Sequence, residues 1–276
     1  MKPFILFITA LFSTLTIPAL AVADSSFPGR AKFPDVKVIE KSQLAKQLQQ
    51  VVIVDARSPL EYRTLRIKGA KNIPVSNKTF VEEIKKLRKQ TKKTIVFYCN
   101  GRTCMKSYVA VKKSKKAKIK NVIAYDAGMF EWAQTYPNQA ELFGASPVNK
   151  GDIITSAKFK KHLLAPDKFG FQLFNSTSKK LVLDVRDKYQ RGAAGFFPRK
   201  ERWVSLNDEE KLTQMILKAK NEKRTLYIYD EVGKQVRWLQ YALEKAKVKN
   251  YYFMGKGAKG YYASMMKDMG ISTNKL

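Results

Sequence analysis

The chain has 276 residues, of which 45% are hydrophobic, so it is long enough for two globular domains that each bury a core. Lysine and arginine together number 53 against 23 acidic residues, which gives a formal net charge of +30. A single histidine excludes a multi-histidine metal site, and two cysteines are too few for a disulfide scaffold. We therefore expect neither a metal nor a cofactor.

The first 23 residues are predicted to be a signal peptide. Lys2 gives a positive start, residues 4–20 form an apolar run without charge, and Ala21 and Ala23 are small residues suited to cleavage. We expect the mature protein to be periplasmic or secreted, and an uncleaved membrane anchor is the alternative. Beyond this segment no stretch is long and apolar enough to cross a bilayer.

The positive charge is spread over both halves of the chain rather than held in one tail. An exported protein meets little nucleic acid, so we expect no nucleic-acid partner. A solvated basic surface is the favoured interpretation. The other is attraction to an anionic membrane, a cell-wall polymer or small anionic substrates, whose encounter rate such a field would raise.

Strand and helix patterns alternate through the first half. A β-branched run at 51–54 ends at Asp55, and a second run at 94–98 ends at Cys99. Between these runs, four apolar residues recur at helical spacing: Phe80, Val81, Ile84 and Leu87. The alternation predicts an α/β unit with a mostly parallel, five-stranded sheet flanked by helices.

The same pattern returns in the second half. The run at 181–183 ends at Asp184 and the run at 225–229 ends at Asp230, which lie 129 and 131 residues after Asp55 and Cys99. Such constant offsets indicate a duplication. The turn-forming stretch Gly-Ala-Ser-Pro after Phe143 marks the boundary, so we predict tandem domains at 24–146 and 150–276.

Cys99 directly follows a predicted strand, which is where open α/β sheets bind ligands. Gly101 allows the loop to curl tightly, so that successive amide hydrogens and the N-terminus of the next helix favour a bound anion. A thiol in this position has a stabilised thiolate and becomes a nucleophile near neutral pH. Cys99 is therefore the candidate catalytic residue.

Three segments of the first half resemble the signatures of the rhodanese superfamily. They are residues 55–62 continuing to 74, residues 97–107 around Cys99, and residues 121–132. The resemblance implies a sulfurtransferase in which Cys99 accepts a sulfane sulfur as a persulfide. The donor would be a small anion such as thiosulfate, and the acceptor a thiol or cyanide.

The resemblance also implies roles for the residues near Cys99. Arg102 is the best candidate to meet an anionic donor, because a guanidinium makes paired hydrogen bonds to an oxyanion. The implied substrate-binding loop consists of Asn100, Gly101, Arg102, Thr103, Cys104 and Lys106. Structural support at the strand end is expected from Asp55, Arg57 and Glu61.

Two departures from the family pattern leave other functions open. The loop reaches its small hydroxyl residue, Ser107, later than the usual loop of the family does. About two more residues separate Cys99 from the next strand than separate Asp230 from its next strand, and a larger loop has room for a bulkier donor than thiosulfate. Cys104 could close a disulfide with Cys99, which would make the first domain a dithiol redox protein. A non-catalytic binding module is a third hypothesis.

Met105 stands where related cell-cycle phosphatases have arginine, which argues against phosphoester chemistry.

Asp230 occupies the nucleophile position of the second domain. A carboxylate cannot carry a sulfane sulfur, but it can accept hydrogen bonds from the free amides at the start of a helix. We predict that Asp230 fills the anion-binding loop with its own side chain. The second domain is then inactive and serves packing, partner docking or the shape of the cleft between the halves.

Overall fold

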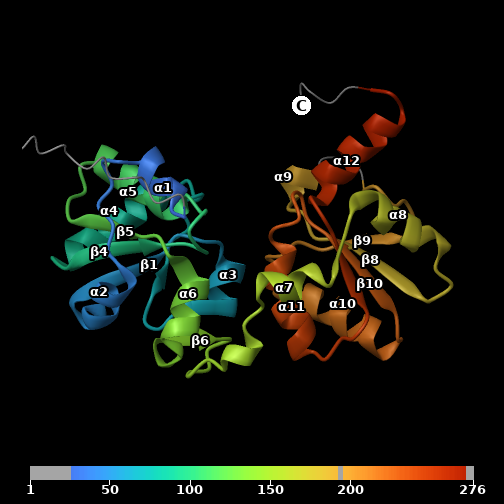
Figure 1. The fold of residues 1–276 in the computed structure, drawn as a ribbon, viewed down its shortest axis with the longest axis horizontal. Helices are drawn as coiled ribbons and strands as arrows, with labels where there is room; N and C mark the ends of the chain where they lie inside the picture. Colours follow the sequence, from blue (N-terminus) through green and yellow to red (C-terminus); the bar gives the residue numbers. More distant parts are fainter. Residues whose placement is uncertain (1–25, 192–194, 272–276) are drawn as a thin grey trace, which may run out of the picture.

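The computed structural model describes residues 26–191 and 195–271, so the predicted signal peptide lies outside the described residues. Figure 1 shows two α/β lobes, which we call the first lobe (residues 26–146) and the second lobe (residues 150–271). Each lobe contains one parallel sheet with helices packed on it. Within the two described ranges, no helix has the length and apolar character needed to span a membrane.

The sheet of the first lobe has the strand order β3-β1-β4-β5, and all of its pairings are parallel. Its strands are β1 (Val51–Asp55), β3 (Lys71–Asn72), β4 (Thr94–Tyr98) and β5 (Val122–Tyr125). The prediction of five strands was wrong for this lobe. The fifth position holds a single bridge between Val38 and Ala124, because α2 (Lys41–Lys46) begins before the segment can extend its pairing.

The second sheet has the five strands that were predicted, in the order β9-β8-β10-β11-β7, again all parallel. They are β7 (Leu163–Leu164), β8 (Lys180–Asp184), β9 (Glu201–Trp203), β10 (Thr225–Tyr229) and β11 (Tyr251–Met254). Matched by position, β8, β10 and β11 correspond to β1, β4 and β5 of the first lobe. The repeated order agrees with the duplication inferred from the constant offsets.

Helices cover both sheets, and a short antiparallel pair, β2 (Leu65–Ile67) with β6 (Ala140–Leu142), lies beside the first sheet. The other helices of the first lobe are α1 (Pro28–Lys32), α3 (Pro59–Thr64), α4 (Phe80–Gln90), α5 (Lys106–Lys116) and α6 (Gly128–Thr135). Those of the second lobe are α7 (Ser156–Lys160), α8 (Pro166–Asn175), α9 (Lys188–Arg191), α10 (Glu209–Asn221), α11 (Val236–Lys245) and α12 (Gly257–Asp268). The helix predicted from the apolar spacing after Phe80 is α4, and its Phe80, Ile84 and Leu87 are buried.

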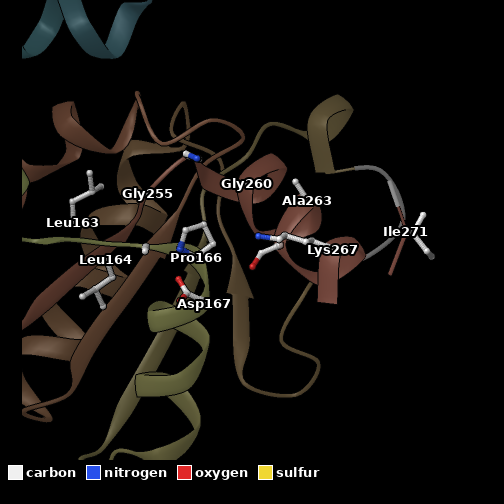
Figure 2. Close-up of a pocket in the computed structure, with 12 residues that line it drawn as sticks. Leu163, Leu164, Pro166, Asp167, Gly255, Gly260, Ala263, Lys267 and Ile271 are labelled. Carbon is white, nitrogen blue, oxygen red and sulfur yellow. The ribbon is translucent and has the colours of Figure 1, made fainter. Parts of the chain in front are cut away.

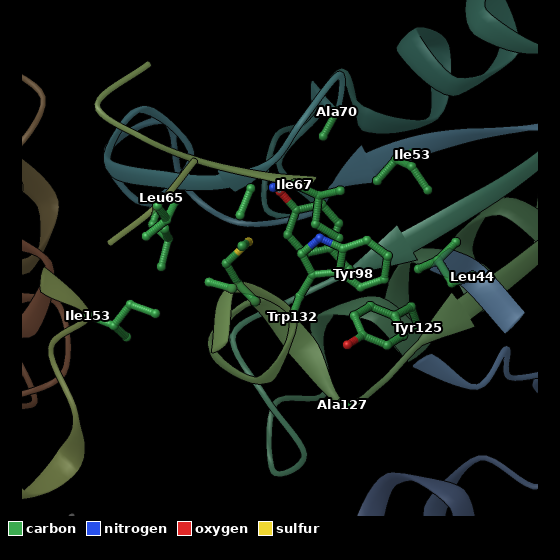
Figure 3. Close-up of a cluster of buried hydrophobic side chains, with 14 of the residues drawn as sticks. Leu44, Ile53, Leu65, Ile67, Ala70, Tyr98, Tyr125, Ala127, Trp132 and Ile153 are labelled. Carbon is green, nitrogen blue, oxygen red and sulfur yellow. The ribbon is translucent and has the colours of Figure 1, made fainter. Parts of the chain in front are cut away.

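Strand β4 positions Cys99 through the alternation of its side chains. Ile95 and Phe97 pack in the cluster beneath α4 and α5, whereas Val96 and Tyr98 pack in the opposite cluster with Trp132 of α6. Figure 3 shows Tyr98, Tyr125 and Trp132 together in this second cluster, which Ile153 also joins. Both faces of β4 are therefore buried up to Tyr98, where the strand ends and the Cys99 loop begins.

Gly128 allows the start of α6 to approach this loop. Its φ is +80°, and a Cβ built on it would lie 2.3 Å from the backbone nitrogen of Gly101. Gly257 holds the matching position in the second lobe, where a Cβ would lie 2.5 Å from the carbonyl oxygen of Asp230. A side chain at either position would push the loop and the helix apart.

We predict that Gly128→Ala lowers the free energy of unfolding by about 3 kcal/mol or more, from the left-handed backbone together with the steric overlap. Gly69→Ala is the matched control, because Gly69 has a φ of +76° but nothing within 4 Å of the added Cβ. It should cost only the backbone term, about 1 kcal/mol. Urea unfolding of both variants measures the difference, and equal losses would contradict the steric argument.

Candidate functional site

Cys99 follows β4 directly, is 2% exposed, and forms a disulfide with Cys104. The two α-carbons are 6.2 Å apart, within the range that a disulfide can bridge. A turn between them, in which the amide of Cys104 donates to the carbonyl of Gly101 at 2.8 Å, brings Cys104 back over the strand end. The pairing that the sequence left open is therefore present in this structure.

The additional residues after Cys99, counted against the second lobe, are divided between the Cys99 loop and helix α5. Helix α5 begins seven residues after Cys99, whereas α11 begins six residues after Asp230, and α5 is one residue longer than α11. Ser107 is the second residue of α5, and its buried hydroxyl oxygen has no hydrogen-bond partner among the described residues. The first turn of α5, three residues after Cys104, thus holds a buried polar group.

Asp55 and Arg57 form a buried ion pair at the end of β1. The Nε of Arg57 donates to Oδ1 of Asp55 at 2.9 Å, and its Nη2 donates to Oδ2 at 2.6 Å. Both side chains are fully buried, and the hydroxyl of Tyr98 also donates to Oδ2 at 2.6 Å. The ion pair expected at this strand end is thus present, while the structural role of Asp55 and Arg57 stays a prediction, and Tyr98 is a partner that the sequence analysis missed.

This ion pair is connected to the Cys99 loop through Asn100. Arg57 Nη1 donates to Oδ1 of Asn100 at 3.1 Å, and Nδ2 of Asn100 donates to Oε1 of Glu61 at 2.6 Å. Lys106 lies 3.5 Å from the other carboxylate oxygen of Glu61. Asn100, Lys106 and Glu61 therefore belong to one network with Arg57, and the side chain of Asn100 anchors the loop.

The network sets the charge states of its members. Burial opposes ionisation of Glu61, but the charges of Arg57 and Lys106 and the hydrogen bond from Asn100 hold its pKa below the usual value. Burial also disfavours the charged form of Arg57, yet the charge of Asp55 raises the pKa of that guanidinium. Both groups are consequently ionised at neutral pH.

Arg102 forms an ion pair with Glu131 of α6. Its Nη2 donates to Oε2 of Glu131 at 3.1 Å and its Nη1 donates to the hydroxyl of Ser26 at 3.0 Å, while its guanidinium lies 4.5 Å from the ring centre of Phe27. The hydrogen bond from Arg102 lowers the pKa of Glu131. Arg102 and Thr103 are exposed at the tip of the loop, and Gly101 packs against the start of α6. The implied role of Arg102 toward a donor stays a prediction.

In the second lobe, Asp230 fills the equivalent loop. Its carboxylate accepts hydrogen bonds from the backbone amides of Val232 at 3.0 Å, Gln235 at 2.5 Å and Val236 at 3.1 Å, and from that of Gly233. The prediction that the carboxylate would occupy the loop amides is confirmed. Arg186 and Asp184 repeat the buried ion pair, with Nη2 2.8 Å from Oδ2.

Helix α11 of the second lobe packs next to the Cys99 loop. The ring of Trp238 stacks on Phe130 with centres 5.1 Å apart and lies 5.0 Å from the guanidinium of Arg57. Arg237 lies 3.9 Å from the ring centre of Phe130, whose amide donates to the carbonyl of Asn100 at 3.4 Å. Sequence reasoning missed these residues, because no local motif marks a contact between two lobes.

A cavity in the second lobe lies away from this site. It has a volume of about 830 Å³ and is bounded by β7, the start of α8 and one face of α12, with Pro166, Asp167 and Lys267 on its walls (Figure 2). None of its lining residues belongs to the loop that begins at Cys99 or to the loop that begins at Asp230. The candidate site is therefore the Cys99 loop with its network.

We predict that Glu61→Gln destabilises the protein by about 3 kcal/mol at neutral pH, because it removes one partner of a buried charge network. Since the folded pKa of Glu61 lies below its unfolded value of 4.5, the stabilisation is fully present above pH 4.5 and is lost as the pH falls through the folded pKa. The variant should therefore lose less stability than the wild type on acidification. Urea unfolding between neutral pH and acid measures both effects.

Glu82→Gln is the control for this prediction. Glu82 is an exposed carboxylate on α4 and should change stability by less than about 0.5 kcal/mol at any of these pH values. If Glu61→Gln keeps the full acid dependence of the wild type, the carboxylate does not have the role that the network gives it.

Comparison with known proteins gives one family match, to the rhodanese-like domain over residues 40–135. No curated protein shows significant sequence similarity to the chain. Solved structures similar to it include the thiosulfate sulfurtransferase from Pseudomonas aeruginosa, at 18% identity and a TM-score of 0.37, covering 86% of this chain and 46% of that one. A rhodanese-related protein from Thermoplasma volcanium, at 20% identity and a TM-score of 0.29, covers 36% of this chain and 93% of that one.

The family match includes β1 with Asp55, α3 with Glu61, β4, the Cys99 loop, α5 and α6. It thus spans the elements that build the candidate site. Residues 40–135 of this chain are a rhodanese-like domain.

Proposed function

We propose that the chain is a sulfurtransferase in which reduced Cys99 accepts a sulfane sulfur from a small anionic donor and passes it to a thiol. The observation that carries the proposal is the loop of Asp230, where four backbone amides donate to one carboxylate. Cys99 stands at the matching strand end of a rhodanese-like domain. A persulfide anion on Cys99 would meet the same kind of amide environment.

The chemistry follows from a thiolate at this position. With thiosulfate as donor, the Cys99 thiolate attacks the outer sulfur, the sulfur–sulfur bond breaks, and sulfite leaves with the electron pair. The persulfide that remains on Cys99 carries one negative charge, which the loop amides and the N-terminus of α5 stabilise. Because Cys99 is bonded to Cys104 in this structure, the disulfide must be reduced before the reaction can begin.

Geometry of the loop is maintained by groups that take no part in bond making. Asn100 is held between Arg57 and Glu61, and the carbonyl of Cys99 accepts a hydrogen bond from the amide of Met129 at 2.9 Å. We assign positioning roles to Arg57, Glu61 and Asn100. The second lobe contributes Trp238 to the same region but has no cysteine of its own.

The predicted leader and the charge of the chain suggest where this chemistry takes place. We propose that the protein is exported, to the periplasm or beyond the cell, and that its net charge of +30 raises the encounter rate with anionic donors at low salt. An anionic membrane or cell-wall polymer is a further partner of this surface. Intact-mass analysis of the protein from its own compartment would show whether the chain begins after Ala21 or Ala23.

A second candidate function is dithiol oxidoreduction, which the Cys99–Cys104 disulfide favours. The two functions differ in the thiols that they need. Dithiol chemistry requires both cysteines, whereas formation of a persulfide requires Cys99 alone.

We predict that reduced Cys104→Ser gains the mass of one sulfur atom on incubation with thiosulfate or inorganic polysulfide, and that Cys99→Ser gains none. Loss of the thiolate removes the only nucleophile at the strand end, since the two cysteines of the chain are Cys99 and Cys104. Intact-mass spectrometry after removal of excess donor measures the gain. A folded Cys104→Ser protein that takes up no sulfur from either donor would refute the proposed function.

A further inference from the structure

The disulfide between Cys99 and Cys104 carries an inference about the fate of the persulfide, and this inference rests on the proposed function. We infer that Cys104 resolves the Cys99 persulfide within the chain, releasing hydrogen sulfide and forming the Cys99–Cys104 disulfide. The protein then reduces sulfane sulfur to sulfide and depends on a dithiol reductant for each new turnover.

The geometry needed for this step is present in the loop. The disulfide shows that the sulfur of Cys104 reaches the Sγ of Cys99, with the α-carbons 6.2 Å apart. The turn from Gly101 to Cys104 creates this approach, and the hydrogen bond between their backbones holds it. In a persulfide, Sγ of Cys99 is the inner sulfur, so Cys104 meets the atom whose bond to the sulfane sulfur must break.

Cys104 also lies where a thiolate is favoured. Only Met105 separates it from α5 (Lys106–Lys116), an eleven-residue helix whose N-terminal amides carry partial positive charge. Lys106, at the first position of that helix, directs its ammonium to Glu61 at 3.5 Å, so the helix N-terminus is the feature that acts on Cys104. The partial positive charge of the helix N-terminus favours a negatively charged sulfur at this position.

The reaction balances without any further oxidant. The Cys104 thiolate attacks Sγ of Cys99, the bond from Sγ to the sulfane sulfur breaks, and that sulfur leaves with the electron pair as hydrosulfide. The sulfane sulfur is reduced by two electrons, and the two cysteines are oxidised by two electrons to the disulfide. A dithiol then reduces the disulfide, becomes a disulfide itself, and restores both thiols.

Resolution by Cys104 competes with transfer to an external acceptor. Cys99 is 2% exposed, so an acceptor has to reach a buried position, whereas Cys104 is attached to the same loop. An intramolecular reaction between groups held in contact has a high effective concentration. Release of sulfide should therefore precede transfer to a dilute monothiol.

The test is a single turnover of the full-length mature protein. Wild type, Cys104→Ser and Cys99→Ser are reduced, freed of reductant under anaerobic conditions, and mixed with one equivalent of thiosulfate or inorganic polysulfide. Free sulfide is measured with a sulfide-specific probe, and the protein with intact-mass spectrometry. Circular dichroism confirms that each variant is folded.

We expect the wild type to release one equivalent of sulfide and to lose the mass of two hydrogen atoms, at a rate at least about ten-fold above that of Cys104→Ser. Cys104→Ser should instead retain the added sulfur atom, and Cys99→Ser should do neither. Addition of a dithiol should then restore the thiols of the wild type and permit a second release of sulfide.

Two results would overturn the inference and leave the proposed function intact. One is a wild-type protein that keeps its persulfide as Cys104→Ser does. The other is a wild-type protein that forms the disulfide without releasing sulfide, while Cys104→Ser still takes up sulfur. A failure of the proposed function differs from both, because Cys104→Ser would then take up no sulfur.

Discussion

The buried guanidinium of Arg57 is the group on which the arrangement of the first strand-end loop depends. A fully buried cation is costly unless its hydrogen-bond donors and its charge are matched, and leaving such a charge without its partner costs about 3–5 kcal/mol. Arg57 meets this demand through Asp55 at one strand end, the carbonyl of Leu65, and Asn100 in the Cys99 loop. The end of β1, the start of β2 and the Cys99 loop are therefore held together by one side chain, and Cys99 is next to Asn100, the loop residue that Arg57 contacts.

The second lobe contains the same device with a different occupant of the loop. Arg186 repeats the pairing with Asp184, and its Nη1 lies 4.0 Å from Glu231, the residue after Asp230, as Arg57 contacts the residue after Cys99. In the second lobe, the carboxylate of Asp230 accepts the hydrogen bonds of the loop amides. A carboxylate supplied by the chain itself occupies these donors permanently. The two lobes thus share the strand, the ion pair and the loop that follows, and the residue that opens the loop is a cysteine in the first lobe and an aspartate in the second.

The sequence predicted most of the elements that bear the site, because strand periodicity and the duplicated motifs are local signals. The runs before Asp55, Cys99, Asp184 and Asp230 are the strands β1, β4, β8 and β10, and the association of Asp55 with Arg57 was expected from their position at a strand end. Residues that meet across the fold escaped prediction. The pairing of Arg102 with Glu131 depends on how α6 approaches the loop, and the contact of Trp238 with Phe130 depends on how two lobes pack. The missing fifth strand has a similar cause, since the segment at Val38 is shortened by the helix that follows it.

The placement of both cysteines in one loop ties the chemistry of the site to its redox state. A nucleophile with no second thiol nearby would keep its sulfur until an acceptor arrived, and its activity would depend on that acceptor alone. Here the second thiol lies five residues away, and the structure shows the two sulfurs bonded. The bonded state blocks Cys99 as a nucleophile while leaving the Arg57 network and its hold on Asn100 in place. None of these hydrogen bonds involves a sulfur atom, so the network holds Asn100 through contacts that are separate from the disulfide.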